Sequence, residues 1–336
     1  MPTLEEIAEI SGVSRSTVSR VINNDPHVSE TTREKVMAVV KELNYQPNAA
    51  ARSLAAGRTH ILGLVIPSGV SALFSDPYFP ILIQGVSATC SAKEYSVMLW
   101  LAEAEFERRT IRQVLHNGLL DGVIVSSMQI GDPIVARLRE SNLPFVLIGR
   151  HPTADEVSYV DVDNDGAAQA AVTHLLRLGR KRIATITGPQ NAAVGQERRK
   201  GYSKALRARG ITVIPELIVE GDFTEDGGAL AMQQLLPHHP DAVFAASDVM
   251  AVGALRVLHA AGLRVPEDVA LVGFDDVPLA ARQTPPLTTI RQPIRQMGAM
   301  AVETLLTLLE DPEHGAHHIL LPTQLVIRDS CGTNLS

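Results

Sequence analysis

The sequence predicts a small all-α head followed by a larger α/β part with doubly wound parallel sheets. Three observations lead to this prediction. Two short amphipathic helices joined by a glycine turn open the chain, strands and helices alternate after residue 60, and that alternation restarts near residue 182. The predicted strands are apolar almost throughout, which is typical of parallel sheets covered by helices on both faces. Two such series in 336 residues indicate two similar lobes with a cleft between them.

Residues 3–23 carry the pattern of a helix-turn-helix, with Gly12 at the turn. The two apolar helical faces are formed by Leu4, Ile7, Ala8 and Ile10, and by Val18, Val21 and Ile22. Thr3 and Glu6 have the spacing of a capping box, and Ser14 is placed to cap the second helix. In such a motif the second helix can enter the major groove of DNA.

The polar face of this second helix is suited to contact DNA. It carries Arg15, Ser16, Ser19 and Arg20, which lie away from the apolar residues and can donate hydrogen bonds to bases or phosphates. An arginine fork matches O6 and N7 of guanine. A plain helical hairpin with a solvated charged face is the alternative, and this stretch alone leaves it open.

The head continues with a third predicted helix, which Ser29 would cap and Asn44 would end. Its buried stripe is formed by Val36, Val39, Val40 and Leu43. Next comes a short stretch of helix formers that Asn48 opens and Gly57 ends. It is about two turns long, and isolated helices of this length are marginal in water. We expect this hinge segment to be helical only when a partner chain and DNA support it.

Beyond residue 60 the chain alternates between apolar runs and amphipathic stretches. The first series predicts strands at 61–67, 96–102, 121–127 and 145–150, with helices at 79–93, 106–117 and 133–141. The second series predicts strands at 182–188, 217–221, 242–247 and 269–274, with helices at 195–209, 226–236 and 249–261. After Pro286 we expect one more strand, a helix and a strand pair.

Composition narrows the class of protein. No apolar run is long enough to span a bilayer and no secretory signal precedes the first helix, so we expect a cytoplasmic protein with no membrane partner. Cys90 and Cys331 are too few for a disulfide framework or a zinc site. The net charge is −7, and the first 60 residues carry seven basic and seven acidic side chains. Bulk charge therefore neither supports nor excludes DNA binding.

The sequence contains no motif of catalysis or of cofactor binding. No strand-to-helix turn carries a dinucleotide- or phosphate-binding glycine loop, and neither HExxH nor GxSxG occurs. The pairs His238-His239 and His317-His318 lie in predicted loops without the spacing of a metal cluster. We therefore expect no catalytic residue, no metal and no cofactor.

Ligands of open α/β sheets bind beyond the carboxyl ends of the strands. At these ends the sequence places aromatic side chains with Asp, Arg and Ser, a combination that suits a small polyol ring. The candidate ligand-binding residues found in this way are Tyr78, Phe79, Trp100, Ser126, Arg150, Arg198, Phe223, Ser247, Asp248 and Asp275. Asp248 could instead cap the helix that follows it, and Trp100 could instead belong to the core.

Motifs along nearly the whole chain resemble those of one family. VSRSTVSRVIN and then HVSETTREKVMAVVKELNYQPNAAARSLAAGRT are similar to the DNA-binding head and hinge of the lactose/galactose-repressor (LacI/GalR) family, without a gap over about sixty residues. The motifs DPYF, VDVDN followed by Gly166, ERRKGY, FAASDVMAVGAL and GFDD extend the match. The resemblance implies a periplasmic-binding-protein-like, two-lobed effector domain in which the chain crosses between the lobes more than once.

The family match implies a division into domains. A helix-turn-helix DNA-binding domain would occupy residues 1–46, a hinge helix 47–58, and an effector-binding and dimerisation domain 60–336. Within that domain, one lobe would comprise about 60–161 plus 293–320 and the other about 162–292 plus 321–332. The chain ends shortly after its last predicted strand, without the leucine-heptad helix that makes the lactose repressor a tetramer, so we expect a homodimer.

The family match also implies roles for individual residues. Base edges would be read by Arg15, Ser16 and Arg20, and the DNA backbone would be held by Ser14, Thr17, Ser19, Asn23, His27 and Thr32. The hinge would enter the minor groove with Asn48, Ala51 and Leu54, where Leu54 would open a base step. In the cleft, Phe79 and Phe223 would flank the effector, and it would be bonded by Arg150, Arg198, Ser247 and Asp275. The VDVDN motif adds Asp163, which could instead only cap a helix.

The function that the resemblance implies is that of a transcriptional repressor of carbohydrate-utilisation genes, which a sugar releases from a pseudo-palindromic operator. Ala192 and Val194 stand where purine repressors place polar ligand contacts, which favours a sugar. The pocket pattern resembles that of regulators of glucosides such as cellobiose or maltose. A corepressor-dependent regulator, which binds DNA better with its ligand, is the alternative. A sugar-transport protein would lack the head, and a two-lobed enzyme would need a catalytic pair.

Overall fold

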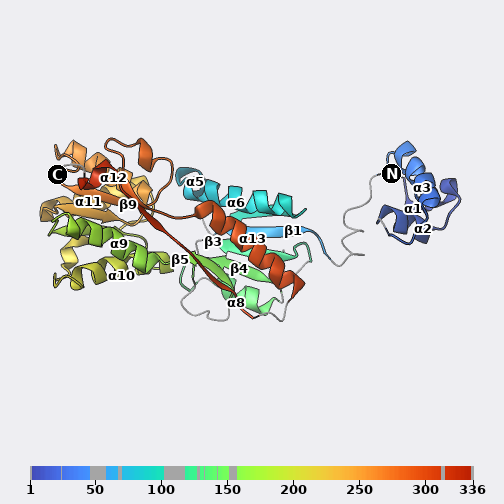
Figure 1. Cartoon of the computed structure of the whole chain (residues 1–336), viewed down its shortest axis with the longest axis horizontal. Helices are drawn as coiled ribbons and strands as arrows, with labels where there is room; N and C mark the ends of the chain where they lie inside the picture. Colours follow the sequence, from blue (N-terminus) through green and yellow to red (C-terminus); the bar gives the residue numbers. More distant parts are fainter. Residues whose placement is uncertain are drawn as a thin grey trace. The chain divides into compact units, whose positions relative to one another are not determined.

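The structure is a computed structural model, shown in Figure 1. It describes residues 2–23, 25–45, 58–66, 70–101, 118–126, 129–131, 133–141, 143–150, 157–311 and 315–333. Backbone contacts divide the chain into two units, Met1–His60 and Ile61–Ser336, and each is described by itself. Within the described residues, no helix is both long enough and apolar enough to cross a membrane.

The first unit contains three helices packed around one small core. They are α1 (Leu4–Ser11), α2 (Arg15–Ile22) and α3 (Glu30–Glu42). The three predicted caps are confirmed. Thr3 and Glu6 form the capping box of α1, and the hydroxyls of Ser14 and Ser29 accept hydrogen bonds from the N–H groups three residues on. The helix-turn-helix pattern thus has the local geometry that the sequence predicts.

One prediction for the core of this unit is wrong. Ile10 was expected on the buried face of α1, but its side chain is 56% exposed. Ser11 occupies the inner position instead, one turn beyond the buried Ile7. Its hydroxyl donates to the carbonyl oxygen of Ile7 at 2.5 Å, so a polar side chain is buried with its hydrogen bond satisfied.

The second unit contains two six-stranded sheets. The first has the order β11-β5-β4-β3-β1-β2, and its strands are β1 (Ile61–Ile66), β2 (Ser96–Leu101), β3 (Gly122–Ser126), β4 (Phe145–Ile148), β5 (Tyr159–Val162) and β11 (His318–Leu321). The second has the order β12-β10-β9-β8-β6-β7, and its strands are β6 (Ile183–Thr187), β7 (Ile218–Glu220), β8 (Ala242–Ala245), β9 (Ala270–Asp275), β10 (Thr288–Arg291) and β12 (Gln324–Val326). Every neighbouring pair is parallel except β10 with β12.

Helices cover these sheets and form two lobes (Figure 1). Those of the first lobe are α5 (Val70–Ser75), α6 (Tyr78–Ala92), α8 (Pro133–Glu140) and α13 (Ile294–Glu310). Those of the second lobe are α9 (Asn164–Arg177), α10 (Ala193–Arg207), α11 (Glu225–Leu235) and α12 (Asp248–Ala260), with short 3-10 turns at Pro215–Leu217, Leu236–His238, Ala280–Arg282 and Asp329–Cys331. Apolar residues between sheet and helices form buried clusters in each lobe, and Val277 from the loop after β9 belongs to a cluster of the first lobe.

The chain passes between the lobes three times. β5 in the first sheet leads to α9 in the second lobe, β10 in the second sheet leads back to α13, and β11 leads to β12. The connections are short, at residues 163, 292–293 and 322–323. The ends of β5, β10 and β11 therefore link the two lobes. Residues at these crossings lie close to any cavity between the lobes.

All the strands predicted in the two series are present, and their ends agree with the predicted ones to within three residues. The predicted helix at 106–117 lies outside the described residues. The structure adds β5 and α9, which were not among the predicted elements. β5 has only four residues and one of them is Asp161, so it has no apolar run, and α9 is rich in alanine and has a weak apolar stripe.

The close packing of α6 against α13 gives a test of the first lobe. A Cβ at Gly85 would overlap the backbone oxygen of Arg295, which a side-chain movement cannot relieve. Gly85→Ala should therefore destabilise the domain by about 1–3 kcal/mol, measured as a lower midpoint of thermal unfolding. Gly315→Ala is the matched control, because a Cβ there meets open space. An unchanged midpoint for Gly85→Ala would contradict the packing described.

Candidate functional site

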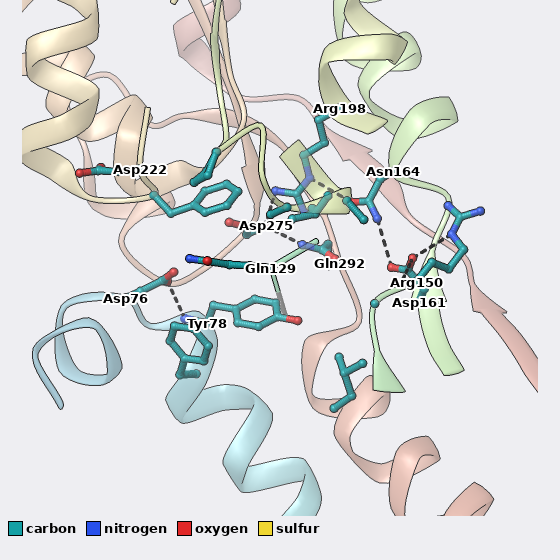
Figure 2. Close-up of a pocket in the computed structure, with 18 of the residues that line it drawn as sticks. Asp76, Tyr78, Gln129, Arg150, Asp161, Asn164, Arg198, Asp222, Asp275 and Gln292 are labelled. Carbon is teal, nitrogen blue, oxygen red and sulfur yellow. Dashed lines mark hydrogen bonds and ion pairs between the residues drawn. The ribbon is translucent and has the colours of Figure 1, made fainter. Parts of the chain in front are cut away.

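The main candidate site is a cavity of about 270 Å³ between the two lobes, shown in Figure 2. Its walls are the ends of strands from both sheets, the start of α6 and α10, and the crossing segments. The residues that line it are Ser75, Asp76, Tyr78, Phe79, Gln129, Ile148, Gly149, Arg150, Asp161, Asn164, Pro189, Asn191, Ala192, Ala193, Val194, Arg198, Asp222, Phe223, Thr224, Asp275, Gln292 and Met297.

Arg198 on α10 holds the polar end of the cavity together. Its side chain is buried, and its Nε donates to the amide oxygen of Asn164 at 3.0 Å. Its Nη1 donates to the carbonyl oxygen of Ala246 at 2.5 Å and lies 3.4 Å from Asp275 Oδ1. The guanidinium also lies over the ring of Phe274, 3.7 Å from the ring centroid. One side chain thus joins α9, β8 and β9.

Asp275 at the end of β9 has a backbone conformation that is rare outside glycine. Its φ is 116°, and that of the next residue, Asp276, is 57°. Gln292 at the second crossing donates to the Asp275 carboxylate at 2.6 Å, and Arg291 and Arg328 both pair with Asp276. These contacts hold a strained turn, which aims the Asp275 carboxylate at the cavity.

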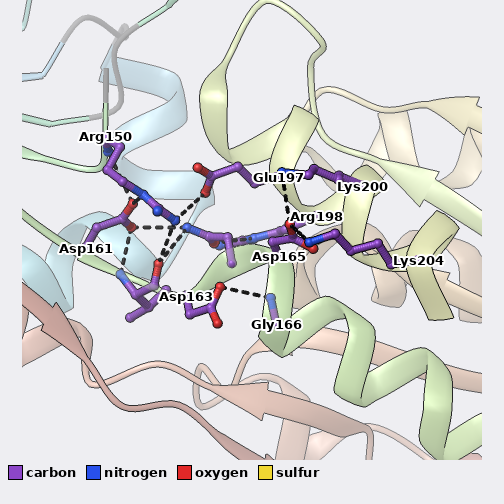
Figure 3. A network of polar contacts seen from close by, with 11 residues as sticks. Arg150, Asp161, Asp163, Asp165, Gly166, Glu197, Arg198, Lys200 and Lys204 are labelled. Carbon is purple, nitrogen blue, oxygen red and sulfur yellow. Dashed lines mark hydrogen bonds and ion pairs between the residues drawn. The ribbon is translucent and has the colours of Figure 1, made fainter. Parts of the chain in front are cut away.

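A second polar network crosses between the lobes and is joined to that of Arg198 through Asn164 (Figure 3). Arg150, which follows β4, donates from Nε to Asp161 at 3.0 Å and from Nη2 to Glu197 of α10 at 3.0 Å. Asp161 also accepts a hydrogen bond from Asn164 at 3.1 Å. Arg150 and Asp161 belong to the first lobe and Glu197 to the second, so this ion-pair network joins the lobes.

Aromatic rings line the cavity from both lobes. Tyr78 and Phe79, at the start of α6, are packed edge to face with their centroids 5.5 Å apart. Phe223 lies in the loop before α11 with a φ of 64°, and its ring lies so close to Gly188 that a Cβ there would overlap it. Gly188, which follows β6, thus leaves the space that the ring of Phe223 occupies.

A backbone contact joins the lobes at a further point of the cavity wall. Residues 129 and 192 form an isolated antiparallel bridge, and the N–H of Ile130 donates to the carbonyl oxygen of Asn191 at 2.6 Å. Gln129 follows β3 of the first lobe, whereas Asn191 and Ala192 precede α10 of the second lobe. The lobes thus meet on two sides of the cavity, here and at the Arg150 network.

Two carboxyl groups that line the cavity are hard to ionise. Burial raises the pKa of Asp76 to about 6, against the opposing effects of the backbone hydrogen bond from Tyr78 and the charge of Arg198. Burial raises the pKa of Asp275 to about 7, although the neighbouring Arg198 guanidinium acts to lower it. Both groups therefore titrate near neutral pH, where a ligand hydroxyl can donate to the ionised form.

The cavity brings together six of the candidate ligand-binding residues. They are Tyr78, Phe79, Arg150, Arg198, Phe223 and Asp275. Arg150 lines the cavity, but its guanidinium is already bound to Asp161 and Glu197, so its first role in the structure is to join the lobes.

Five other candidates do not line the cavity. Trp100 lies on the edge strand β2 and packs against Gly63 and a core cluster, the alternative that the sequence left open. Ser126 is a fully buried residue of β3. Asp163 caps α9 by accepting a hydrogen bond from the N–H of Gly166 at 2.9 Å (Figure 3).

Ser247 and Asp248 also have structural contacts. Ser247 caps α12 by accepting a hydrogen bond from the N–H of Met250 at 3.2 Å. The carboxylate of Asp248 accepts hydrogen bonds from Thr289 at 2.5 Å and from the N–H of Val277 at 3.0 Å. It therefore ties α12 to β10 and to the loop after β9. The rule that ligands bind beyond the carboxyl ends of the strands, here called the strand-end rule, selected these positions. It does not distinguish residues that face a ligand from residues that cap the next helix.

The sequence reasoning missed several lining residues that carry polar groups. Gln129, Asp161, Asn164 and Gln292 were not proposed. Asn164 and Asp161 lie within the VDVDN motif, beside the Asp163 that was chosen. Gln292 directly follows the predicted strand after Pro286, so the strand-end rule would have reached it. No sequence signal marked Gln129.

The head offers a second candidate interface. Arg15, Ser16 and Arg20 of α2 are exposed, whereas Val18 and Val21 of the same helix are buried. Arg15 pairs with Glu5 at 2.6 Å, and both side chains are more than 60% exposed. Such an exposed pair contributes little to stability, so Arg15 can exchange it for a base or phosphate at small cost.

The proposed backbone-contacting residues form short local hydrogen bonds. The hydroxyl of Ser14 lies 2.7 Å from that of Ser16 and 2.8 Å from that of Thr17, and Thr32 contacts the cap of α3 at 2.8 Å. The remaining residues of this set are Ser19, whose hydroxyl accepts from Asn23 at 3.4 Å, and His27, which lies 3.0 Å from the Asp25 carboxylate. The predicted hinge residues Asn48, Ala51 and Leu54 lie outside the described residues.

A helical head with an exposed polar face on its second helix, followed by two α/β lobes around a cavity, is the arrangement expected of a DNA-binding protein that responds to a small ligand. Residues 3–48 match the model of bacterial regulatory proteins of the lacI family, and residues 172–331 match that of a periplasmic binding protein-like domain.

In the part of the chain that the structure describes, no three metal-ligating side chains lie close enough to hold an ion.

Several known proteins are similar to the chain over almost its whole length. The transcriptional regulator CelR of Thermobifida fusca is 41% identical over 333 residues, 98% of each chain. The ribose operon repressor of Escherichia coli is 35% identical over 334 residues, 98% of this chain and 100% of the repressor.

Solved structures show the same similarity. A CelR–cellobiose complex is 40% identical over 98% of this chain and 100% of its own, with a TM-score of 0.79. The lac repressor dimer bound to operator and the anti-inducer ONPF is 30% identical over 98% and 99%, with a TM-score of 0.85. The chain belongs to the LacI family of transcriptional regulators, and this family is not one of enzymes.

Asp76 gives a pH-dependent test of the cavity. The pKa of Asp76 is higher in the folded protein than in the unfolded chain, so the folded state favours the protonated carboxyl. The stability that the protonated carboxyl contributes is fully present below the unfolded pKa of 3.8 and is lost as the pH rises through about 6. Asp76→Asn can still accept the Tyr78 hydrogen bond and carries no charge. It should raise the stability of the effector domain by about 1–3 kcal/mol at pH 8 and by about half as much at pH 5.

The measurement is thermal unfolding of both proteins at the two pH values. Glu216→Gln removes an exposed carboxylate outside the cavity and should show no such pH-dependent difference. A gain for Asp76→Asn that is equal at both pH values would show that the carboxyl is not titrating in this range.

Proposed function

We propose that this protein is a cytoplasmic, homodimeric transcriptional repressor of carbohydrate-utilisation genes, and that a small sugar bound between its lobes releases it from operator DNA. The observation that carries the proposal is the cavity, where aromatic rings face buried Arg and Asp side chains in a chain that also has a helix-turn-helix head. The similarity to a CelR–cellobiose complex, 40% identical over 98% of the chain, supports a glucoside such as cellobiose.

The lining of the cavity suits a sugar ring in two respects. The rings of Phe79 and Phe223 offer apolar faces against which the C–H groups of a pyranose can stack. Arg198, Asp275 and Gln292 then offer a donor, an acceptor and an amide to the hydroxyls. The side chains of Ala192 and Val194 cannot hydrogen-bond a purine at this wall of the cavity. We therefore favour a sugar, and we assign Arg150 to joining the lobes rather than to the ligand.

The DNA-bound state that we propose uses the head and the hinge. Two heads of a dimer would read half-sites of a pseudo-palindromic operator, with Arg15, Ser16 and Arg20 at base edges. The backbone phosphates would be held by Ser14, Thr17, Ser19, Asn23, His27 and Thr32. A hinge at 47–58 would present Asn48, Ala51 and Leu54 to the minor groove.

The proposed switch depends on the low stability of a two-turn helix. A helix of this length needs its partner and the DNA to persist. Sugar binding that changes the spacing of the two hinge segments therefore requires a coupling free energy of only ~1–3 kcal/mol to weaken the grip on DNA. A sugar that weakens operator binding is an inducer, and one that strengthens operator binding is a corepressor.

Replacement of the buried arginine tests the sugar response. The wild-type protein should leave its operator fragment when cellobiose is added, in a gel-shift or fluorescence-anisotropy titration. Arg198→Lys loses the fork that contacts Asn164, Ala246 and Asp275, so it should bind the operator but require about tenfold or more sugar for release. The matched control is Arg199→Lys, because Arg199 is the exposed neighbour on the same helix.

The outcomes of this titration separate the alternatives. Tighter operator binding with sugar would replace the inducer by a corepressor. No response to any member of a panel of mono- and disaccharides would contradict the proposed sugar effector.

Leu54 tests the role of the hinge. Leu54→Ala removes the side chain that would open a base step, so operator affinity should fall by roughly tenfold or more while sugar affinity is retained. Operator binding is measured by anisotropy and sugar binding by calorimetry on the same preparation. Operator affinity equal to that of the wild type would refute the hinge role, and a loss of sugar affinity would point to misfolding.

A further inference from the structure

The charges around the cavity are unbalanced. Its lining contains four carboxylates, Asp76, Asp161, Asp222 and Asp275, and among the described residues only two cationic side chains, Arg150 and Arg198. The other lining residues are uncharged. An excess of negative charge in a partly enclosed site repels anions and attracts neutral hydrogen-bond donors or cations.

Neither guanidinium is available to balance the charge of an incoming anion. Arg198 is 4% exposed, pairs with Asp275 and also contacts Asn164 and the oxygen of Ala246. Arg150 pairs with Asp161 and also with Glu197, which lies behind the lining. An anionic ligand would have to displace a carboxylate from one of these pairs and leave that carboxylate buried without its partner, which is strongly unfavourable.

Two carboxylates have no cationic partner of this kind among the described residues. Asp76 accepts the backbone N–H of Tyr78 at one oxygen. Asp222 accepts the backbone N–H and the hydroxyl of Thr224, both at one oxygen. The second oxygen of each makes no hydrogen bond to the described residues and can accept one from a ligand hydroxyl or ammonium. Figure 2 shows Asp76 and Asp222 on one side of the cavity, opposite Arg150 and Asp161.

We propose that the cavity selects by charge: it binds neutral or amino sugars and rejects sugars that carry a carboxylate or a phosphate, with Asp76 and Asp222 as the residues that exclude them. This inference rests on the proposed function and specifies its ligand class. It separates a sugar from a uronic acid with the same closed ring, for example glucose from glucuronic acid, and also from a sugar phosphate.

The test compares matched pairs of sugars by calorimetry at pH 8 on the full chain. The pairs are cellobiose with cellobiouronic acid, glucose with glucuronic acid and galactose with galacturonic acid, in which every ring stays closed. Ribose with ribose 5-phosphate adds a phosphate, and glucosamine is the cationic member. For whichever neutral sugar binds, we expect its acidic partner to bind at least about 100-fold more weakly. For glucose we expect glucosamine to bind at least as well.

Two variants test whether Asp76 and Asp222 cause the charge selection. Asp76→Asn and Asp222→Asn each remove one charge and keep the oxygen that accepts the local hydrogen bond. Each should narrow the affinity ratio between neutral and acidic partners by about tenfold. Either variant alone suffices if the other does not fold. Glu216→Gln removes an exposed carboxylate away from the cavity and should leave the ratio unchanged.

The possible failures have different meanings. An acidic sugar that binds as tightly as its neutral partner overturns the charge selection and leaves the proposed repressor intact. An affinity ratio that neither variant changes overturns the assignment to Asp76 and Asp222. A protein that binds no sugar of the panel, neutral or charged, contradicts both the proposed effector and this inference.

Discussion

The buried Arg198 guanidinium is the contact on which the structure of the cavity depends. It joins the start of α9 through Asn164, the end of β8 through Ala246 and the end of β9 through Asp275, and it covers the ring of Phe274. A buried cation is tolerated only when such partners surround it, and each partner is in turn fixed by it. The polar end of the cavity is therefore preformed, and a ligand need not order it.

The three crossings of the chain explain why both lobes contribute to this site. Asn164 follows the first crossing and Gln292 forms the second, so residues from the connections line the cavity together with strand ends. Arg291, which precedes the second crossing, and Arg328, which follows β12, both pair with Asp276 beside the cavity-lining Asp275. A movement of one lobe against the other therefore acts on residues that line the cavity. The coupling that we propose between sugar binding and lobe position requires such an arrangement.

Much of this fold follows from local patterns in the sequence. The capping residues Thr3, Ser14 and Ser29 and the apolar strands were predicted because each depends on neighbours within one turn or one strand. β5 was not predicted, because its burial comes from a sheet formed by distant segments, β4 and β11. Ile10 was predicted to be buried, but the inner position is taken by Ser11, whose hydroxyl donates to the carbonyl oxygen of Ile7 and can therefore be buried.

The candidate site was predictable in part. The strand-end rule reaches Phe79, Arg198, Phe223 and Asp275, because the carboxyl ends of parallel strands meet at one edge. The same rule also selects positions such as Ser247, because a residue that follows a strand can equally cap the next helix. Residues such as Gln129 reach the cavity only through the approach of the other lobe, and no local pattern records that approach.

That approach includes a bond from the main chain of one lobe to the main chain of the other, between Ile130 N–H and Asn191 oxygen. Because peptide groups form it, side-chain replacements at residues 129, 130, 191 and 192 other than proline can retain it. This stretch of the cavity wall can therefore change its chemistry while the lobes continue to meet there. A scaffold built in this way can acquire a new ligand by point substitution while it keeps this contact between its lobes.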